Sequence, residues 1–153
     1  MLKFVKGDLL EAKEDFICHQ VNCMGVMGSG VAKQIGDKWP QVKYMYQKRC
    51  SLFPLAKRGT LLGRILAIKI NETQYVINVF GQYNYGRDRN RVYTDYAALQ
   101  KAFTTMRYPN KTYAFPYRFG CGLANGDWTT VRSLIEKILA YDHEVVIYER
   151  DAR

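Results

Sequence analysis

Two glycine-rich loops, each entered from a short apolar strand and left through a helix, constrain the fold of this chain more than any other feature. The first loop spans residues 22–30 after the apolar run Phe16–Val21, and the second spans 116–127 after Thr112–Phe115. Repeated strand–loop–helix units are typical of α/β proteins with a parallel sheet. In such sheets, ligands lie in the crevice outside the carboxyl ends of the strands. We therefore expect both loops to line one ligand crevice.

The rest of the chain continues this alternation of strands and helices. Short apolar runs predict further strands at residues 2–5, 63–70, 75–80 and 144–148. Helices are expected at 30–38, 42–50, 93–106 and 128–140, and the last has the clearest helical repeat of apolar residues. The pattern predicts an α/β architecture with a mainly parallel central sheet, and the length favours a single domain.

The charge balance indicates the kind of partner. The chain holds 23 Lys and Arg against 14 Asp and Glu, a formal charge of +9. Such an excess of cations favours an anionic partner, either a nucleic acid, a nucleotide or another phosphorylated ligand. No apolar run is long enough to cross a membrane, and the opening residues Met-Leu-Lys-Phe-Val do not resemble a secretory leader. We therefore expect a cytoplasmic protein that binds no membrane.

The cysteines and histidines do not form a metal-binding pattern. The four cysteines are scattered, and no two of them form a C-x-x-C pair. His19 and His143 lie near opposite ends of the chain, with no Cys/His cluster around either. We expect reduced thiols, no zinc site and no cofactor.

Glycine has two physical uses in the two loops. It adopts positive φ without strain, and it has no Cβ to keep backbone N–H groups away from a phosphate. The helix after each loop adds unpaired N–H groups and a positive dipole end. Two such loops are suited to gripping a diphosphate from both sides. However, neither loop has the spacing of a P-loop or of a dinucleotide fingerprint, so the alternative is that the glycines only make tight turns.

Four segments of the chain resemble the macro domain family, the ADP-ribose-binding module. They are Lys6–Leu10, residues 21–34, Tyr75–Asn78 and Phe119–Trp128. The Phe119–Trp128 segment is the most specific, and it is similar to the branch of ADP-ribose-1″-phosphate phosphatases and terminal ADP-ribose glycohydrolases. The resemblance implies a three-layer α/β/α fold with a central mixed, mainly parallel sheet over residues 1–153. It also implies ADP-ribose or ADP-ribose-1″-phosphate as the ligand, with ADP-ribosylated protein or poly-ADP-ribose as further partners of a monomer.

The resemblance also implies ligand contacts for individual residues. Asp8 would accept a hydrogen bond from the adenine amine, with the Leu9 backbone beside it, and Asn22 would bind hydroxyls of the distal ribose. Phe119 would cover a ribose. The backbones of the two loops would hold the diphosphate, from one side with Gly28, Ser29, Gly30 and Val31 and from the other with Gly120, Cys121, Gly122 and Leu123. The alternatives are turn formation for the polar residues and packing for the aromatic ring.

The chemistry implied by the family is only partly present. Glycohydrolases of the branch use a lysine and an aspartate, and these positions fall on Gln82 and Ala124 here. The phosphatases are matched differently, by His19 before Asn22 and by Asp127 at the end of the second loop. His19 would orient or deprotonate a water, and Asp127 would orient His19 or that water. A buried core histidine and a helix N-cap are the structural alternatives for these two residues.

Our first hypothesis is therefore that the protein binds ADP-ribose and hydrolyses ADP-ribose-1″-phosphate to ADP-ribose and phosphate. The alternatives are a non-catalytic ADP-ribose reader, or an ADP-ribosyl hydrolase that acts on modified protein through an activated water. A further hypothesis is a binder of nucleic acid or poly-ADP-ribose that uses the basic loop 87–91 and its neighbouring tyrosines. A solvated basic loop is the simpler alternative for residues 87–91.

Overall fold

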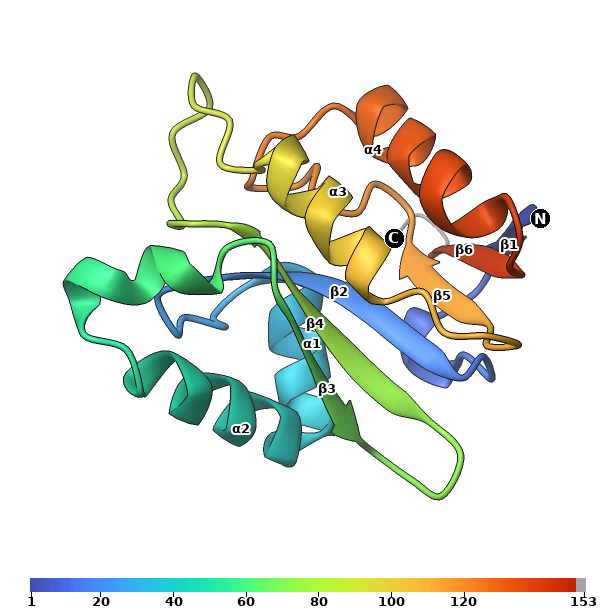
Figure 1. The fold of residues 1–153 in the computed structure, drawn as a ribbon, viewed down its shortest axis with the longest axis horizontal. Helices are drawn as coiled ribbons and strands as arrows, with labels where there is room; N and C mark the ends of the chain where they lie inside the picture. The colour runs from blue at the N-terminus through green and yellow to red at the C-terminus, as the bar shows by residue number, and fades with distance from the viewer. Residues whose placement is uncertain (151–153) are drawn as a thin grey trace.

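Six strands form one mixed, mostly parallel sheet at the centre of the computed structural model, which describes residues 1–150 (Figure 1). The strands are β1 (Leu2–Lys6), β2 (Phe16–Asn22), β3 (Ile65–Lys69), β4 (Tyr75–Gln82), β5 (Tyr113–Pro116) and β6 (Val145–Glu149). Their order across the sheet is β1-β6-β5-β2-β4-β3, and every neighbouring pair is parallel except β3 with β4. The predicted fold class is confirmed.

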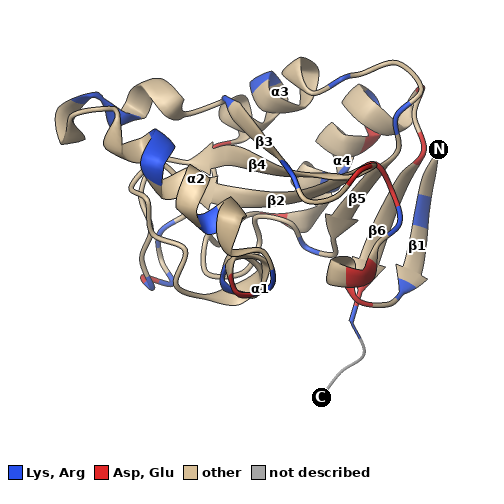
Figure 2. Ribbon diagram, turned by 90° about the horizontal axis from the view of Figure 1, so that it is seen from below, with Lys and Arg blue, Asp and Glu red and all other residues tan. Residues whose placement is uncertain are grey.

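Helices cover both faces of this sheet. They are α1 (Gly30–Lys38), α2 (Pro40–Ser51), α3 (Tyr96–Thr105) and α4 (Trp128–Ile135), which continues as the π-helical segment η3 (Glu136–Ala140). Two short 3₁₀ helices, η1 (Leu9–Glu11) and η2 (Leu55–Leu61), complete the set. Figure 2 shows α1 and α2 on one side of the sheet and α3 and α4 on the other.

The central strand β2 shows why both faces need helices. Its Phe16 and Cys18 side chains belong to the core beneath α3 and α4, whereas Ile17 and Val21 belong to cores on the other face. Residues on alternate positions of a strand point to opposite faces, so a strand that is apolar at both sets of positions must be covered twice. The carboxyl end of β2 is therefore held rigidly between two packed layers.

The structure differs from the predicted elements most clearly in three places. The helix expected from residue 93 begins at Tyr96, because Asp95 caps it by accepting a hydrogen bond from the Ala98 N–H, and Thr94 pairs with Gln82 in an isolated bridge. The helix expected through residue 140 changes to π-helical geometry after Ile135. The 3₁₀ helix η2 was not predicted, since its sequence has no apolar repeat. None of the helices formed by residues 1–150 is both long enough and apolar enough to span a membrane.

Candidate functional site

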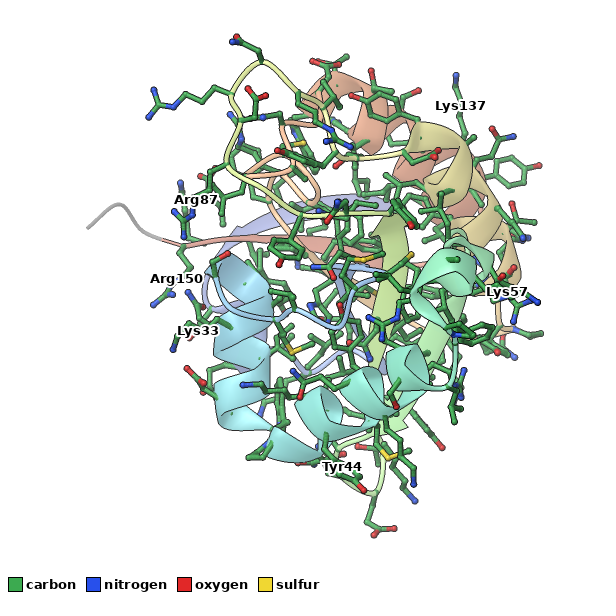
Figure 3. The ribbon with its side chains drawn as sticks, turned by 90° about the vertical axis from the view of Figure 1, so that its left-hand side faces the viewer. Lys33, Tyr44, Lys57, Arg87, Lys137 and Arg150 are labelled. Carbon is green, nitrogen blue, oxygen red and sulfur yellow. The ribbon has the colours of Figure 1, made fainter. Side chains whose placement is uncertain are left out.

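An open cleft of about 820 Å³ lies at the carboxyl ends of β2, β4 and β5. The two glycine loops form opposite walls of this cleft, as the strand–loop–helix pattern predicts. A third wall comes from the loop between β4 and α3, where Tyr85, Gly86 and Arg87 line the cleft. Figure 3 shows Arg87 on this loop, above the helix α1 that carries Lys33. The structure thus brings three segments far apart in sequence to one site.

The first wall is the start of α1. Gly28, Ser29, Gly30 and Val31 all line the cleft. Gly30 has a φ of +61°, and a Cβ placed on it would meet nothing within 4 Å. Ser29 is the N-cap residue, yet its side chain makes no capping hydrogen bond. The N–H groups of the first turn therefore lack the side-chain acceptor that usually satisfies them, which suits an anionic ligand at this helix end.

The second wall is a tight loop whose shape depends on glycine. Gly120 has a φ of +72°, and its carbonyl oxygen accepts hydrogen bonds from the Gly126 N–H at 2.9 Å and from the Thr94 hydroxyl at 2.6 Å. Gly122, at the tip, has free space around its missing Cβ and lines the cleft. Arg118, before the tip, has a φ of +60°, which costs energy for a residue other than glycine. The backbone is therefore strained at Arg118, in the loop that lines the cleft.

A matched pair of alanine variants tests how this second wall is built. A Cβ on Gly126 would lie 2.5 Å from the carbonyl oxygen of Gly120, whereas a Cβ on Gly122 would touch nothing. Alanine lowers the conformational entropy of the unfolded chain, which stabilises the fold by a few tenths of a kcal/mol, but the clash with the backbone costs more. Gly126→Ala should therefore lose about 1 to 2 kcal/mol of unfolding free energy. Gly122→Ala should change it by less than about 0.5 kcal/mol. Urea denaturation of both variants measures the difference, and equal stabilities would contradict the close approach.

The second and third walls are tied together by Asn125. This residue has a φ of 59°, and its side-chain amide donates to the carbonyl oxygens of Asp88 at 2.9 Å and Arg91 at 2.7 Å. The Ala124 carbonyl oxygen also accepts from the Tyr93 N–H. The loop between β4 and α3 is therefore fixed against the second glycine loop by side-chain and backbone hydrogen bonds.

The charged side chains that line the cleft are of one sign. Arg87 and Arg118 line it, and within residues 1–150 no Asp, Glu or Lys does so. The two arginines add to the backbone donors of both glycine loops. The cleft is thus complementary to a ligand that carries phosphate groups.

His19 lies at the base of the cleft and is almost fully buried. Its Nε2 is 2.7 Å from Oδ1 of Asn78, whose Nδ2 donates to the Leu66 carbonyl oxygen. The Asn78 oxygen is therefore the acceptor, so Nε2 carries the proton and Nδ1 is left with a lone pair. Nδ1 has no hydrogen-bond partner. Burial lowers the pKa of His19 to about 4, so the ring is neutral at pH 7.

Asn22 also lines the cleft, and its side chain shapes the first loop. Its Oδ1 accepts hydrogen bonds from the Met24 and Val26 N–H groups and from the Tyr46 hydroxyl. Its Nδ2 donates to the Val26 carbonyl oxygen at 2.8 Å. Asn22 thus has the turn-forming role considered from the sequence, and these hydrogen bonds fix its side chain at the carboxyl end of β2.

Several predicted site residues do not line the cleft. Asp127 is the N-cap of α4, where its carboxylate accepts from the Thr130 N–H and hydroxyl, and these bonds hold its pKa below the ordinary value. Asp8 caps η1 by accepting from the Leu10 N–H, and Leu9 is buried in the core. Both carboxylates therefore have the structural role that was the alternative for them.

Phe119 and Cys121 belong to the second glycine loop, and of these two residues only Phe119 lines the cleft. The Phe119 ring is 2% exposed and packs against Phe103 and Phe115, with centroids 5.9 and 5.3 Å away, so packing describes this side chain. The Cys121 side chain is buried and does not line the cleft, and burial raises its thiol pKa to about 11. Leu123, by contrast, lines the cleft and is half exposed.

Three polar residues of the cleft were not predicted from the sequence. Tyr117 and Arg118 directly follow β5, and their place after the carboxyl end of a predicted strand was the signal that could have identified them. Gln20 lies within β2 and donates to Gln82 Oε1 and to the Thr94 hydroxyl, at 2.8 and 2.9 Å. Its position in a strand gives no such signal.

Comparison with known proteins agrees with this geometry. No model of a protein family matches the chain. The chain is 27% identical over 154 residues to a DNA ADP-ribosyl glycohydrolase of Mycobacterium tuberculosis, covering 97% of this chain and 42% of that protein. The chain thus spans about two fifths of the length of such curated relatives.

Solved structures show the same fold. The macrodomain of Mycobacterium tuberculosis DarG superposes with a TM-score of 0.76 at 25% identity, over 97% of each chain. A Thermosipho africanus DarTG structure in complex with ADP-ribose has a TM-score of 0.77 at 20% identity, covering 97% of this chain and 41% of that one. Taken together with the paired glycine loops, these likenesses show that the chain has the macro domain fold and is similar in sequence to the DarG macrodomain.

Proposed function

We propose that the cleft binds ADP-ribose, with the diphosphate held between the two glycine loops. The observation that carries this proposal is the pair of opposed backbone walls, open at Gly30 and Gly122, in a cleft lined by two arginines and no carboxylate. Phosphate groups between these walls would accept from unpaired N–H groups on both sides. The ADP-ribose complex of the related Thermosipho structure supports the choice of ligand.

The proposed orientation places the distal ribose near Asn22 and the adenine near η1, beside the first turn of α1. Asn22 is the last residue of β2, and His19 lies three residues earlier in the same strand. Val31 belongs to the same apolar cluster as Leu9, which brings the residue after Asp8 close to the α1 wall. In this orientation, Asp8 and Leu9 keep the adenine contacts that the family resemblance implies. The reactive C1″ carbon would then lie at the end of the cleft where His19 is found.

We further propose that the protein is a hydrolase that cleaves the bond between C1″ and a group attached to ADP-ribose. A water would donate a hydrogen bond to the free Nδ1 of His19 and attack C1″. As the bond to the leaving group breaks, the hydroxyl stays on the ribose, and the proton passes by way of His19 to the leaving group. The names of the curated relatives support a macromolecular leaving group. No lysine of residues 1–150 lines the cleft, so no covalent lysine adduct enters this route.

Hydrolysis of ADP-ribose-1″-phosphate is the second candidate. The observation that favours it is the pair Arg87 and Arg118, since two guanidinium groups in one cleft suit a ligand with a third phosphate. In this reaction, the water aligned by His19 would attack phosphorus, and the P–O bond to the ribose would break. The same cleft thus serves both candidates, and the scissile bond distinguishes them.

Titration and two turnover assays test the proposal. Calorimetry should detect ADP-ribose binding, and turnover should be measured with an ADP-ribosylated oligonucleotide or protein and with ADP-ribose-1″-phosphate. His19→Gln keeps a donor for Asn78 but removes the proton-accepting nitrogen, so turnover should fall at least about tenfold while affinity is retained. ADP-ribose binding without turnover of any substrate would leave the reader function and refute the hydrolase.

Asp127→Asn is the matched control for the catalytic assignment. Asparagine still accepts hydrogen bonds at an N-cap, so α4 should stay capped while the carboxylate charge is lost. Because Asp127 does not line the cleft, turnover should match that of the wild type. A loss of turnover in this variant, with an unchanged melting temperature, would instead give Asp127 the catalytic role implied by the family resemblance.

A further inference from the structure

The net charge of the molecule is concentrated in one continuous segment. Residues 38–71 contain eight Lys and Arg and no Asp or Glu, so the other 119 residues hold 15 cations against 14 acids. This segment forms α2, η2 and β3 at one end of the molecule, away from β1 and α4 (Figures 1 and 2). The +9 charge is therefore strongly one-sided.

Four cations of α2 and η2, three of them exposed and Arg49 half-buried, form a surface that we name the α2–η2 face. Among the ion pairs of residues 1–150, none joins a carboxylate to the cations of this face, which are Lys43, Lys48, Arg49 and Lys57. In Figure 3, Lys57 and Tyr44 both point outward from it. Cations without internal partners are available to an anionic partner.

Large apolar and aromatic side chains lie among these cations. Tyr44 is 61% exposed, Leu52 is 69% exposed and Leu55 is 65% exposed. The Lys48 ammonium lies 5.9 Å from the Tyr44 ring centroid, so charge and ring are adjacent. Cations that neutralise phosphates, interleaved with rings on which bases stack, are the combination that binds single-stranded nucleic acid. An acidic protein would match the charge alone.

The α2–η2 face is continuous with the cleft. Arg58 of η2 donates to the Met24 carbonyl oxygen, and Gln47 of α2 donates to that of Gly25, both at 3.0 Å, so the two helices hold the first glycine loop. The Tyr83 ring lies against Gly59 of η2, and two residues later Tyr85 lines the cleft. A chain that leaves the distal-ribose end of the cleft would therefore pass these two exposed tyrosines to reach the face.

We propose that the α2–η2 face is a docking surface for a single-stranded nucleic acid, with its phosphates on the lysines and a base on Tyr44. The route from the cleft to this face rests on the proposed function. The affinity of the face for an unmodified strand does not depend on what the cleft binds.

Fluorescence anisotropy with an unmodified single strand of about 15 nucleotides tests the surface at several salt concentrations. The four cations of the face should give a slope of log affinity against log salt of about −3, from about −0.7 for each phosphate neutralised. Replacing Lys43, Lys48 and Lys57 by Gln should make the slope shallower by about 2 and weaken binding at least about tenfold. Tyr44→Ala should weaken binding by a further factor of about ten, and Tyr44→Phe should not.

The control variant replaces three exposed lysines elsewhere, Lys3, Lys111 and Lys137, by Gln and so has the same net charge. It should bind the strand as the wild type does, and both triple variants should keep the ADP-ribose affinity measured by calorimetry. Equal losses in the two triple variants would overturn the docking surface. Displacement of the strand by polyglutamate at equal charge concentration would also overturn it, in favour of an acidic protein partner. Failure of ADP-ribose binding alone would refute the proposed function and leave this surface standing.

Discussion

Gly122→Glu is expected to weaken ADP-ribose binding on the order of a hundredfold or more while the protein stays folded. The missing Cβ of Gly122 faces open space, and Gly122 lines the cleft, so the first carbon of a longer side chain meets no atom of the folded protein. The carboxylate would then occupy the space proposed for the diphosphate and repel it. Calorimetry measures the affinity, and the melting temperature shows whether the fold is kept.

Gly122→Gln separates the two causes of this loss. Glutamine has nearly the same size as glutamate but no charge, so it retains the steric part and removes the repulsion. It should therefore bind more strongly than the Glu variant and more weakly than the wild type. An unchanged affinity in a folded Gly122→Glu protein would show that the diphosphate does not lie between the two glycine loops.

The free energy of unfolding of the wild type is expected to fall by about 3 kcal/mol between pH 7 and pH 4 because of the protonation of His19 alone. Burial holds the pKa of His19 at about 4 in the folded protein, against an ordinary value of 6.5. Between these values the unfolded chain binds more protons than the folded one, so acid favours unfolding. The stabilisation is complete above pH 6.5 and is lost as pH falls through 4.

Urea denaturation of the wild type and of His19→Gln, repeated at several pH values, isolates this contribution. The variant has no titrating group at position 19, so its stability should depend less steeply on pH by about the same 3 kcal/mol over the full range. The difference between the two slopes is the test, whatever stability the variant has at pH 7. Parallel slopes would mean that His19 is protonated as easily in the folded protein as in the unfolded chain.

The sequence predicted the elements that local patterns determine. Helix α1 was expected at the residues where it lies, because Gly30 follows a glycine-rich loop and Trp39 precedes a proline, which ends a helix. The parallel strands were found because buried strands are rich in apolar residues on both faces, as in β2. The position of both glycine loops then followed from a rule about sheets, since loops after parallel strands meet at one edge.

What could not be predicted depends on contacts between distant segments. For Asp127 the sequence left a catalytic role and an N-cap open, and the structure shows that its carboxylate caps α4, while the Asp8 cap of η1 was not predicted. Burial of His19 depends on Asn78 in a neighbouring strand, 59 residues away, and this contact determines which ring nitrogen is free. Arg118 lines the cleft with its backbone in a left-handed conformation, which the residue type does not predict.

The hydrogen bonds of Asn125 have a consequence for how quickly ligands exchange. Because they join two walls of the cleft before any ligand arrives, binding has little loop order to create and loses little conformational entropy. Capture then becomes one diffusive encounter, with no slow closing movement to wait for. Compounds that share the ADP-ribose group would enter at similar rates and differ mainly in their residence times.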